Sequence, residues 1–122
     1  LTAYSGSKAA LAIMTKNIAN SLTGHQIRVN ALNIGWTDTP AEHDIQKRVH
    51  KKGDDWLDQE ERKVPFKRLT KTIDVAKGLA FMCSDESGLM TGSVIDFDQT
   101  VNGWHSYSAY ETNILDDSLL GE

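Results

Sequence analysis

Cysteine, proline and long apolar runs are scarce in this chain of 122 residues, and each scarcity excludes a class of protein. The single cysteine, Cys83, rules out a disulfide within the chain and fits a reducing compartment. Its place in an apolar run predicts a buried, inert thiol. No apolar run approaches the ~20 residues that cross a bilayer, and the first residues lack the pattern of a secretory leader. A cytoplasmic protein without a membrane span is therefore expected.

An excess of positive charge is also missing, which argues against a nucleic-acid partner. The formal net charge is −4, whereas nucleic-acid binders carry a basic stripe. The basic residues near position 50 are followed at once by acidic ones, so this stretch is interpreted as a solvated surface. The histidines lie too far apart to share a metal ion and are predicted to be on the surface. They are His25, His43, His50 and His105.

Apolar periodicity predicts an α/β protein. Two segments have helical spacing, and two are short, apolar and rich in β-branched residues. These are helices over residues 4–22 and 73–84, and strands over residues 27–32 and 94–97. Helices that alternate with strands favour a parallel sheet with crossover connections. Because two strands cannot make a stable parallel sheet, partner strands are expected outside this chain.

Tyr4 and Lys8 stand four residues apart at the start of the first helix, so their side chains share one face. A tyrosine hydroxyl titrates near ~10, and an adjacent ammonium group and the helix N-terminal dipole both lower that pKa. The pair therefore predicts a phenol that exchanges a proton with an alcohol or a ketone, while a cofactor carries the hydride. By itself such a pair is more often a solvated helix edge.

The sequence blocks that accompany this pair are a more specific signal than the pair itself. Three blocks occur in order along the chain: YSGSKAAL, then IRVNALNIGWTDTP, then PFKRLTKTIDVAKGLAFMCSDESGLMTGSVIDFD. Together they resemble the short-chain dehydrogenase/reductase family, in its compact single-domain branch, over residues 1 to about 98. The resemblance implies the C-terminal half of one dinucleotide-binding and catalytic domain, with the C-terminal part of a Rossmann-like, doubly wound parallel sheet.

The resemblance also implies site residues. Tyr4 would be the general acid/base, and Lys8 would lower its pKa and bind the nicotinamide ribose. Cofactor contacts are further expected from a segment called here the cofactor loop, residues 33–39, through Asn33, Ile34, Gly35, Trp36, Thr37 and Thr39. Glycine would let the backbone approach the nicotinamide ring closely. The alternative is that Gly35 only ends a strand and that Thr39 only caps the next helix.

Two segments are expected to bear on specificity. Residues 41–62, the flap, correspond to the family's mobile substrate cover, with Trp36, Trp56 and Leu57 as candidate substrate contacts. The alternative is that Trp56 pins the flap to its own domain. The aromatic tail, residues 99–122, is hypothesised to cross a subunit interface. The family usually has proline where this chain has Ile34, which leaves the path of the loop open.

The expected activity is the interconversion of a secondary alcohol and a ketone with NAD or NADP, in a homo-oligomer, either a dimer or a tetramer. Sugars or polyols are the favoured substrates, and ketoacyl thioesters stay open. The phosphate-binding loop and the catalytic serine are expected upstream of Leu1, so residues 1–122 alone are not expected to be active. The alternative is a non-catalytic, nucleotide-binding sensor or scaffold. No metal is expected.

Overall fold

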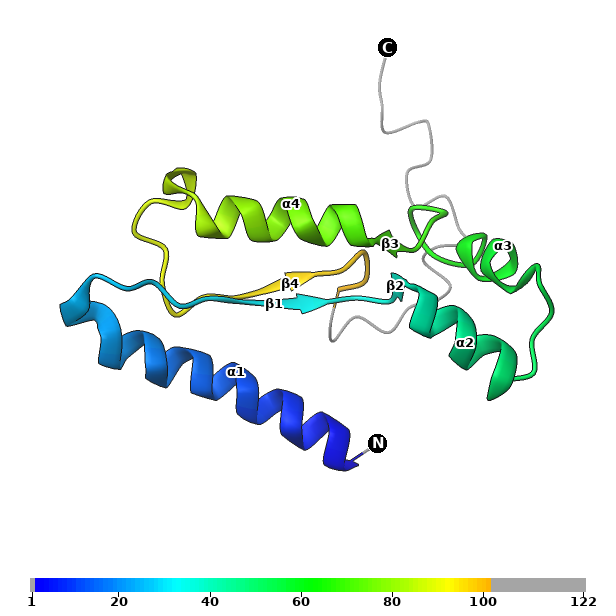
Figure 1. Cartoon of the computed structure of the whole chain (residues 1–122), viewed down its shortest axis with the longest axis horizontal. Helices are drawn as coiled ribbons and strands as arrows, with labels where there is room; N and C mark the ends of the chain where they lie inside the picture. Colours follow the sequence, from blue (N-terminus) through cyan, green and yellow to red (C-terminus); the bar gives the residue numbers. More distant parts are fainter. Residues whose placement is uncertain (1, 102–122) are drawn as a thin grey trace, which may run out of the picture.

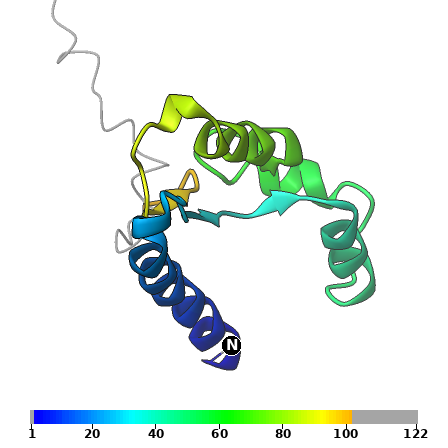
Figure 2. The same cartoon turned by 60° about the vertical axis from the view of Figure 1, so that its left-hand side comes forward.

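Residues 2–101 are described by a computed structural model, in which two parallel strands lie between two helices (Figure 1). Strand β1 (Ala31–Ile34) pairs in parallel with β4 (Val94–Phe97) over four residue pairs. Helices α1 (Thr2–Leu22) and α4 (Thr72–Cys83) lie on opposite sides of these strands in both views (Figures 1 and 2). The α/β class with parallel strands and crossover connections is therefore confirmed.

The flap stands beyond the carboxyl ends of these strands (Figure 1). A second, very short parallel pair marks its two stems, because β2 (Thr37–Asp38) pairs with β3 (Thr70–Lys71). Between the stems lie α2 (Pro40–Arg48) and α3 (Trp56–Glu61). Two single-turn 3-10 helices, η1 (Thr23–His25) and η2 (Asp85–Ser87), follow α1 and α4. Residues 102–122 of the predicted aromatic tail lie outside the described residues.

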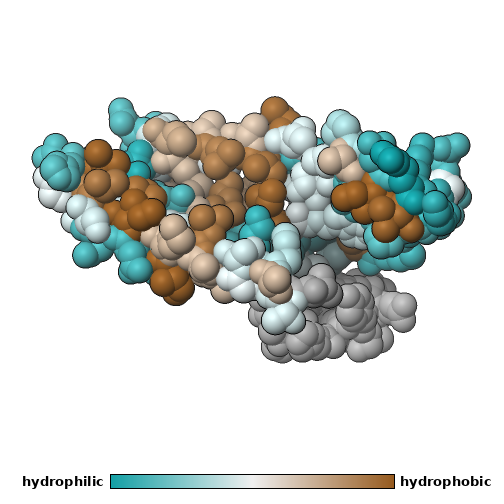
Figure 3. All heavy atoms as spheres, turned by 60° about the horizontal axis from the view of Figure 1, so that its bottom comes forward, coloured by the Kyte–Doolittle hydropathy of each residue, from teal (hydrophilic) through white to brown (hydrophobic). Residues whose placement is uncertain are grey.

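The buried face of helix α1 is made of small residues. Thr15 and Ala19 are its buried positions, and the Thr15 hydroxyl donates to the Leu11 carbonyl oxygen at 2.9 Å, so the buried group is paired. The larger apolar stripe, which includes Met14 and Ile18, is about half exposed. Figure 3 shows apolar side chains gathered on the side of the molecule that carries α1, whereas the flap end is mostly hydrophilic.

The strand predicted at residues 27–32 is displaced along the sequence, because the observed strand spans Ala31–Ile34. The residues before it form hydrogen bonds outside the β1–β4 ladder. The Asn30 side chain donates to the Met90 carbonyl oxygen at 2.8 Å and accepts from the Ser93 amide at 3.0 Å. This side-chain pairing holds the chain extended and delays the ladder until Ala31.

The C-terminal end of α4 contradicts one prediction. Cys83 is exposed, although its apolar surroundings in the sequence predicted burial. Met82 takes the inward position instead and is 7% exposed. Arg28 caps this helix end by donating to the carbonyl oxygens of Met82 and Ser84, both at 2.9 Å. The Cys83 thiol therefore lies on the outer face of the helix, and the Met82 side chain is the one buried in the core.

The opposite end of α4 is held by Asp74, whose protonation makes the stability of the fold dependent on pH. Its carboxylate accepts from both Arg68 and the Lys71 amide, and these hydrogen bonds lower the pKa of Asp74 from 3.8 to about 2. The folded pKa lies below the unfolded one, so the stabilisation is present above pH 3.8 and is lost as the pH falls towards 2.

We expect Asp74→Asn to reduce the loss of thermal stability between neutral pH and about pH 2, because the substituted side chain no longer takes up the proton. The measurement is the melting temperature as a function of pH. Asp44→Asn, which removes an exposed carboxylate on α2, is the matched control. An acid slope that stays the same in Asp74→Asn contradicts this prediction.

Candidate active site

A cavity of about 330 Å³ lies between α1 and β1. Its walls come from residues on one face of the helix and from the whole strand: Tyr4, Lys8, Leu11 and Ala12 from α1, and Ala31, Leu32, Asn33 and Ile34 from β1. The N-terminus of α1 points the same way as the carboxyl end of β1 (Figure 1). The structure therefore brings both predicted catalytic residues and the start of the cofactor loop to one cavity.

Within this cavity, Tyr4 and Lys8 are arranged as the four-residue spacing predicts. The Lys8 ammonium lies 5.5 Å from the centroid of the Tyr4 ring. The Tyr4 side chain is 64% exposed, and its backbone carbonyl oxygen accepts from the Ser7 hydroxyl at 2.7 Å. A phenol that is open to solvent, with a cation one helical turn away, is suited to proton exchange with a small molecule.

Gly35, in the cofactor loop, is required for a reason that the sequence did not reveal. Its amide donates to the Phe97 carbonyl oxygen at 3.0 Å, which extends the β1–β4 ladder by one residue. A Cβ atom at Gly35 would lie 2.2 Å from the Asp98 Oδ1 atom and 3.0 Å from the Asp98 Cβ atom. Gly35 is not among the described glycines with positive φ, so the requirement is for space. No feature of the sequence marks Asp98 as this neighbour.

The two predicted threonines of the cofactor loop make local contacts. Thr39 accepts from the Glu42 amide at 3.1 Å and so caps α2, as the alternative interpretation of this residue predicts. Its hydroxyl proton stays available for a second bond, so capping and cofactor binding are compatible. Thr37 donates to the Gly35 carbonyl oxygen at 2.8 Å. Neither side chain lines the α1–β1 cavity.

None of the three predicted substrate contacts lines the α1–β1 cavity. Trp56 is 1% exposed, and its ring stacks on Trp36 with the ring centroids 6.3 Å apart. The His43 and Trp56 rings form a T-shaped pair with their centroids 4.8 Å apart. In this arrangement the Trp56 indole has almost no surface for a substrate, which favours the interpretation that it pins the flap. Leu57 is half-buried. Substrate contact by these residues stays a prediction.

An ionic network ties both stems of the flap together. Asp38 on β2 pairs with His43 at 2.7 Å and with Lys71 at 2.9 Å, and Lys71 also pairs with Glu61 at 2.6 Å. The hydrogen bond from Lys71 is the main cause that lowers the pKa of Asp38 and of Glu61. Burial opposes the charge on Lys71, but the two carboxylates outweigh it and raise the pKa of Lys71.

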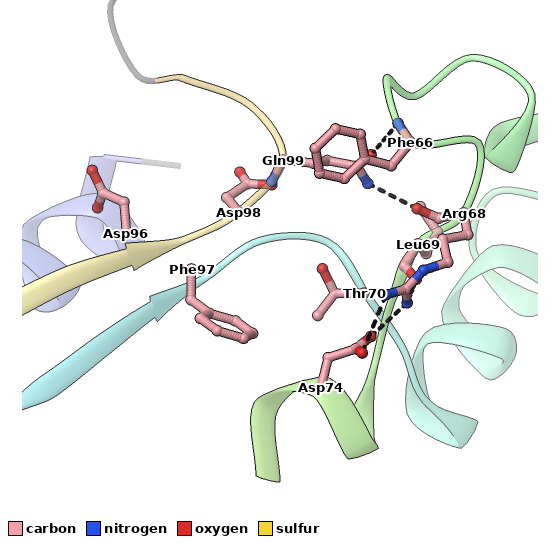
Figure 4. Close-up of a pocket in the computed structure, with 9 residues that line it drawn as sticks. All are labelled: Phe66, Arg68, Leu69, Thr70, Asp74, Asp96, Phe97, Asp98 and Gln99. Atoms are coloured by element: carbon pink, nitrogen blue, oxygen red, sulfur yellow. Dashed lines mark hydrogen bonds and ion pairs between the residues drawn. The ribbon is translucent and has the colours of Figure 1, made fainter. Parts of the chain in front are cut away.

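A second cavity, of about 270 Å³, lies at the carboxyl end of β4 (Figure 4). The Gln99 side chain spans this cavity and reaches residues 66–68, the segment that follows the flap. Its Oε1 atom accepts from the Phe66 amide and its Nε2 atom donates to the Arg68 carbonyl oxygen, both at 2.9 Å. Gln99, which the sequence did not single out, therefore holds the outgoing stem of the flap against β4.

Over residues 2–101, no group of histidine, cysteine and acidic side chains is arranged to hold a metal ion. In the same range, no helix combines the length and the apolar character that crossing a membrane requires. His25 and His50 are exposed, and His105 lies outside the described residues.

Comparison with known proteins identifies the family. The profile described as Enoyl-(Acyl carrier protein) reductase matches residues 1–102. The chain is 35% identical over 97 residues to the 3-oxoacyl-[acyl-carrier-protein] reductase FabG of Thermotoga maritima, covering 80% of this chain and 37% of the relative. Thus the chain spans well under half the length of this curated relative.

Two solved structures are similar in both sequence and fold. A short chain dehydrogenase family protein from Francisella tularensis is 38% identical with a TM-score of 0.69, over 80% of this chain and 42% of that protein. L-sorbose reductase from Gluconobacter frateurii, solved with NADPH and L-sorbose, is 29% identical with a TM-score of 0.72, over 83% and 40%. The chain belongs to the short-chain dehydrogenase/reductase family.

Proposed function

We propose that residues 1–122 form the C-terminal half of the catalytic domain of an NAD(P)-dependent oxidoreductase that interconverts a secondary alcohol and a ketone. The observation that carries this proposal is the α1–β1 cavity, because Tyr4, Lys8 and the start of the cofactor loop line it together. Its volume is of the size that ligand sites have, roughly 300–1,000 Å³. Its walls combine apolar side chains with a phenol and an ammonium group, which suits a flat ring with a polar edge.

When bound, the nicotinamide supplies the site that accepts or gives the hydride. The residues of this chain transfer the proton and position the substrate and the nicotinamide. In alcohol oxidation, Tyr4 takes the hydroxyl proton of the substrate, and in ketone reduction it returns a proton to the carbonyl oxygen. Lys8 places a positive charge beside the Tyr4 ring and would bind the ribose hydroxyls of the cofactor. Backbone groups of Ile34 and Thr37 would hold the carboxamide of the ring, and the Thr39 hydroxyl would add a donor.

Sugars or polyols are the substrate class that we propose to test first. The support is the similarity to L-sorbose reductase, whose solved complex holds L-sorbose. Similarity to an acyl-carrier-protein reductase makes ketoacyl thioesters the second class. The complete protein is further proposed to be a cytoplasmic homo-oligomer, a dimer or a tetramer, which light scattering on the purified protein tests.

The test is a panel assay on the complete protein. Secondary alcohols, including polyols, are incubated with NAD or with NADP, and the absorbance of the reduced nicotinamide is followed. We expect turnover with at least one alcohol and one of the two cofactors. Tight cofactor binding without turnover on any alcohol or ketone would favour the non-catalytic sensor. Absence of both binding and turnover contradicts the proposal.

A further inference from the structure

The Trp36 side chain joins the cofactor loop to the flap. Its indole Nε1 atom donates to the Glu42 carboxylate of α2 at 2.7 Å. Its ring stacks on Trp56 of α3, with centroids 6.3 Å apart and planes at 29°. The Lys52 ammonium, from the segment between these helices, lies 5.8 Å from the centroid of the Trp36 ring. One side chain therefore contacts all three parts of the flap.

The backbone of Trp36 is fixed independently of these contacts. Its carbonyl oxygen accepts from the Thr70 amide at 3.2 Å, at the start of β3. The ionic network around Asp38 and Lys71 joins the stems to the two ends of the flap, through His43 of α2 and Glu61 of α3. Loss of the Trp36 indole is therefore expected to loosen the part of the flap between His43 and Glu61, while these two residues stay attached to the stems.

The interior of the flap leaves two buried polar atoms unpaired. Among the described residues, the buried Trp56 Nε1 and Gln46 Oε1 atoms have no hydrogen-bond partner. Buried polar groups without partners destabilise the state that buries them. Contacts that reach the flap from outside, such as those of Trp36, therefore add to the internal pairs that hold it in place.

We propose that Trp36 is a positioning residue that latches the flap to the cofactor loop and so sets the affinity for the substrate. This inference rests on the proposed function. Trp36 does not line the α1–β1 cavity, so its effect reaches the substrate through the flap. Without the latch, only a fraction of the protein has the flap closed, and part of the free energy of substrate binding is used to close it. The apparent affinity for the substrate therefore falls, which raises KM and leaves kcat unchanged.

The test compares Trp36→Ala, Trp36→Phe and the unchanged complete protein. In Trp36→Ala, we expect KM for the substrate to rise roughly 10-fold or more, since a hydrogen bond to a charged group and an aromatic stack are both lost. Hydrogen exchange of the amides of residues 41–62 should rise by a similar factor. The value of kcat and the exchange of α4 should stay unchanged, and any change in the cofactor Kd should be smaller than the rise in KM. Trp36→Phe keeps an aromatic ring, so its KM and its flap exchange should lie between those of Trp36→Ala and those of the unchanged protein.

Phe81→Ala is the matched control, because it removes a half-exposed aromatic ring from α4. It should leave the exchange of the flap unchanged. Unchanged flap exchange in Trp36→Ala overturns the proposal, as does a raised cofactor Kd with unchanged KM. If Trp36→Ala fails to fold, the same two readouts on Trp36→Phe decide. Hydrogen exchange does not depend on turnover, so an inactive complete protein would refute the proposed function and still leave the latch tested.

Discussion

Tyr4→Phe in the complete protein is expected to reduce kcat for alcohol oxidation by about 10²–10⁴-fold, the usual contribution of a positioned general acid or base. The ring that fills the cavity wall stays in place, and only the hydroxyl is lost. The cofactor Kd should therefore be unchanged. Steady-state kinetics at saturating cofactor, together with a fluorescence titration of the cofactor, measure the two quantities.

Lys8→Met is the informative companion to this variant, because it keeps the length of the side chain and removes its charge. We expect a lower kcat together with weaker cofactor binding, since Lys8 is proposed to act on both the phenol and the ribose. Turnover by Tyr4→Phe at the rate of the unchanged enzyme would remove the proposed role of Tyr4, whatever Lys8→Met shows.

Gly35→Ala is expected to have the second largest effect. The added methyl group would overlap the Asp98 carboxylate, with 2.2 Å between the new Cβ atom and Asp98 Oδ1. Overpacking in a core costs about 1–3 kcal/mol of stability, and because the Asp98 side chain is exposed we expect about 1 kcal/mol here. Because Gly35 continues the β1–β4 ladder into the cofactor loop, the shift should also weaken cofactor binding. Thermal unfolding and a cofactor titration on the complete protein measure both effects.

Second substitutions at Asp98 identify the cause. Asp98→Ala removes the carboxylate but leaves the Cβ contact at 3.0 Å, so it should relieve Gly35→Ala in part. Asp98→Gly removes both contacts and should relieve it further. The double-mutant cycle should therefore show a coupling between residues 35 and 98 that grows from alanine to glycine. Additive effects would mean that the glycine is needed for another reason, such as close approach of the cofactor ring.

Several elements were predictable from the sequence because local chemistry decides them. The Tyr4–Lys8 pair needs only the helical period, and the strand at residues 94–97 needs only its apolar, β-branched composition. Thr39 before Pro40 predicts the cap of α2, and the structure has it.

Other features were out of reach because they depend on contacts between distant parts of the chain. Strand β1 begins at Ala31, four residues later than predicted, because the Asn30 side chain is paired with residues some 60 positions away. The thiol of Cys83 is exposed because Met82 fills the core. The need for Gly35 comes from Asp98, and the latch of the flap comes from Trp36 and Trp56. No local pattern encodes any of these pairs.

The most direct test of the central claim follows an isotope through the reaction of the complete protein. A secondary alcohol deuterated at its carbinol carbon is oxidised in a single turnover, and the products are analysed by mass spectrometry. We predict one deuterium on the reduced nicotinamide for each ketone formed, with the transfer slowed strongly in Tyr4→Phe. Ketone formation without deuterium on the nicotinamide, or equally fast transfer in Tyr4→Phe, would contradict the account of Tyr4 as the acid/base of a nicotinamide-dependent oxidoreductase.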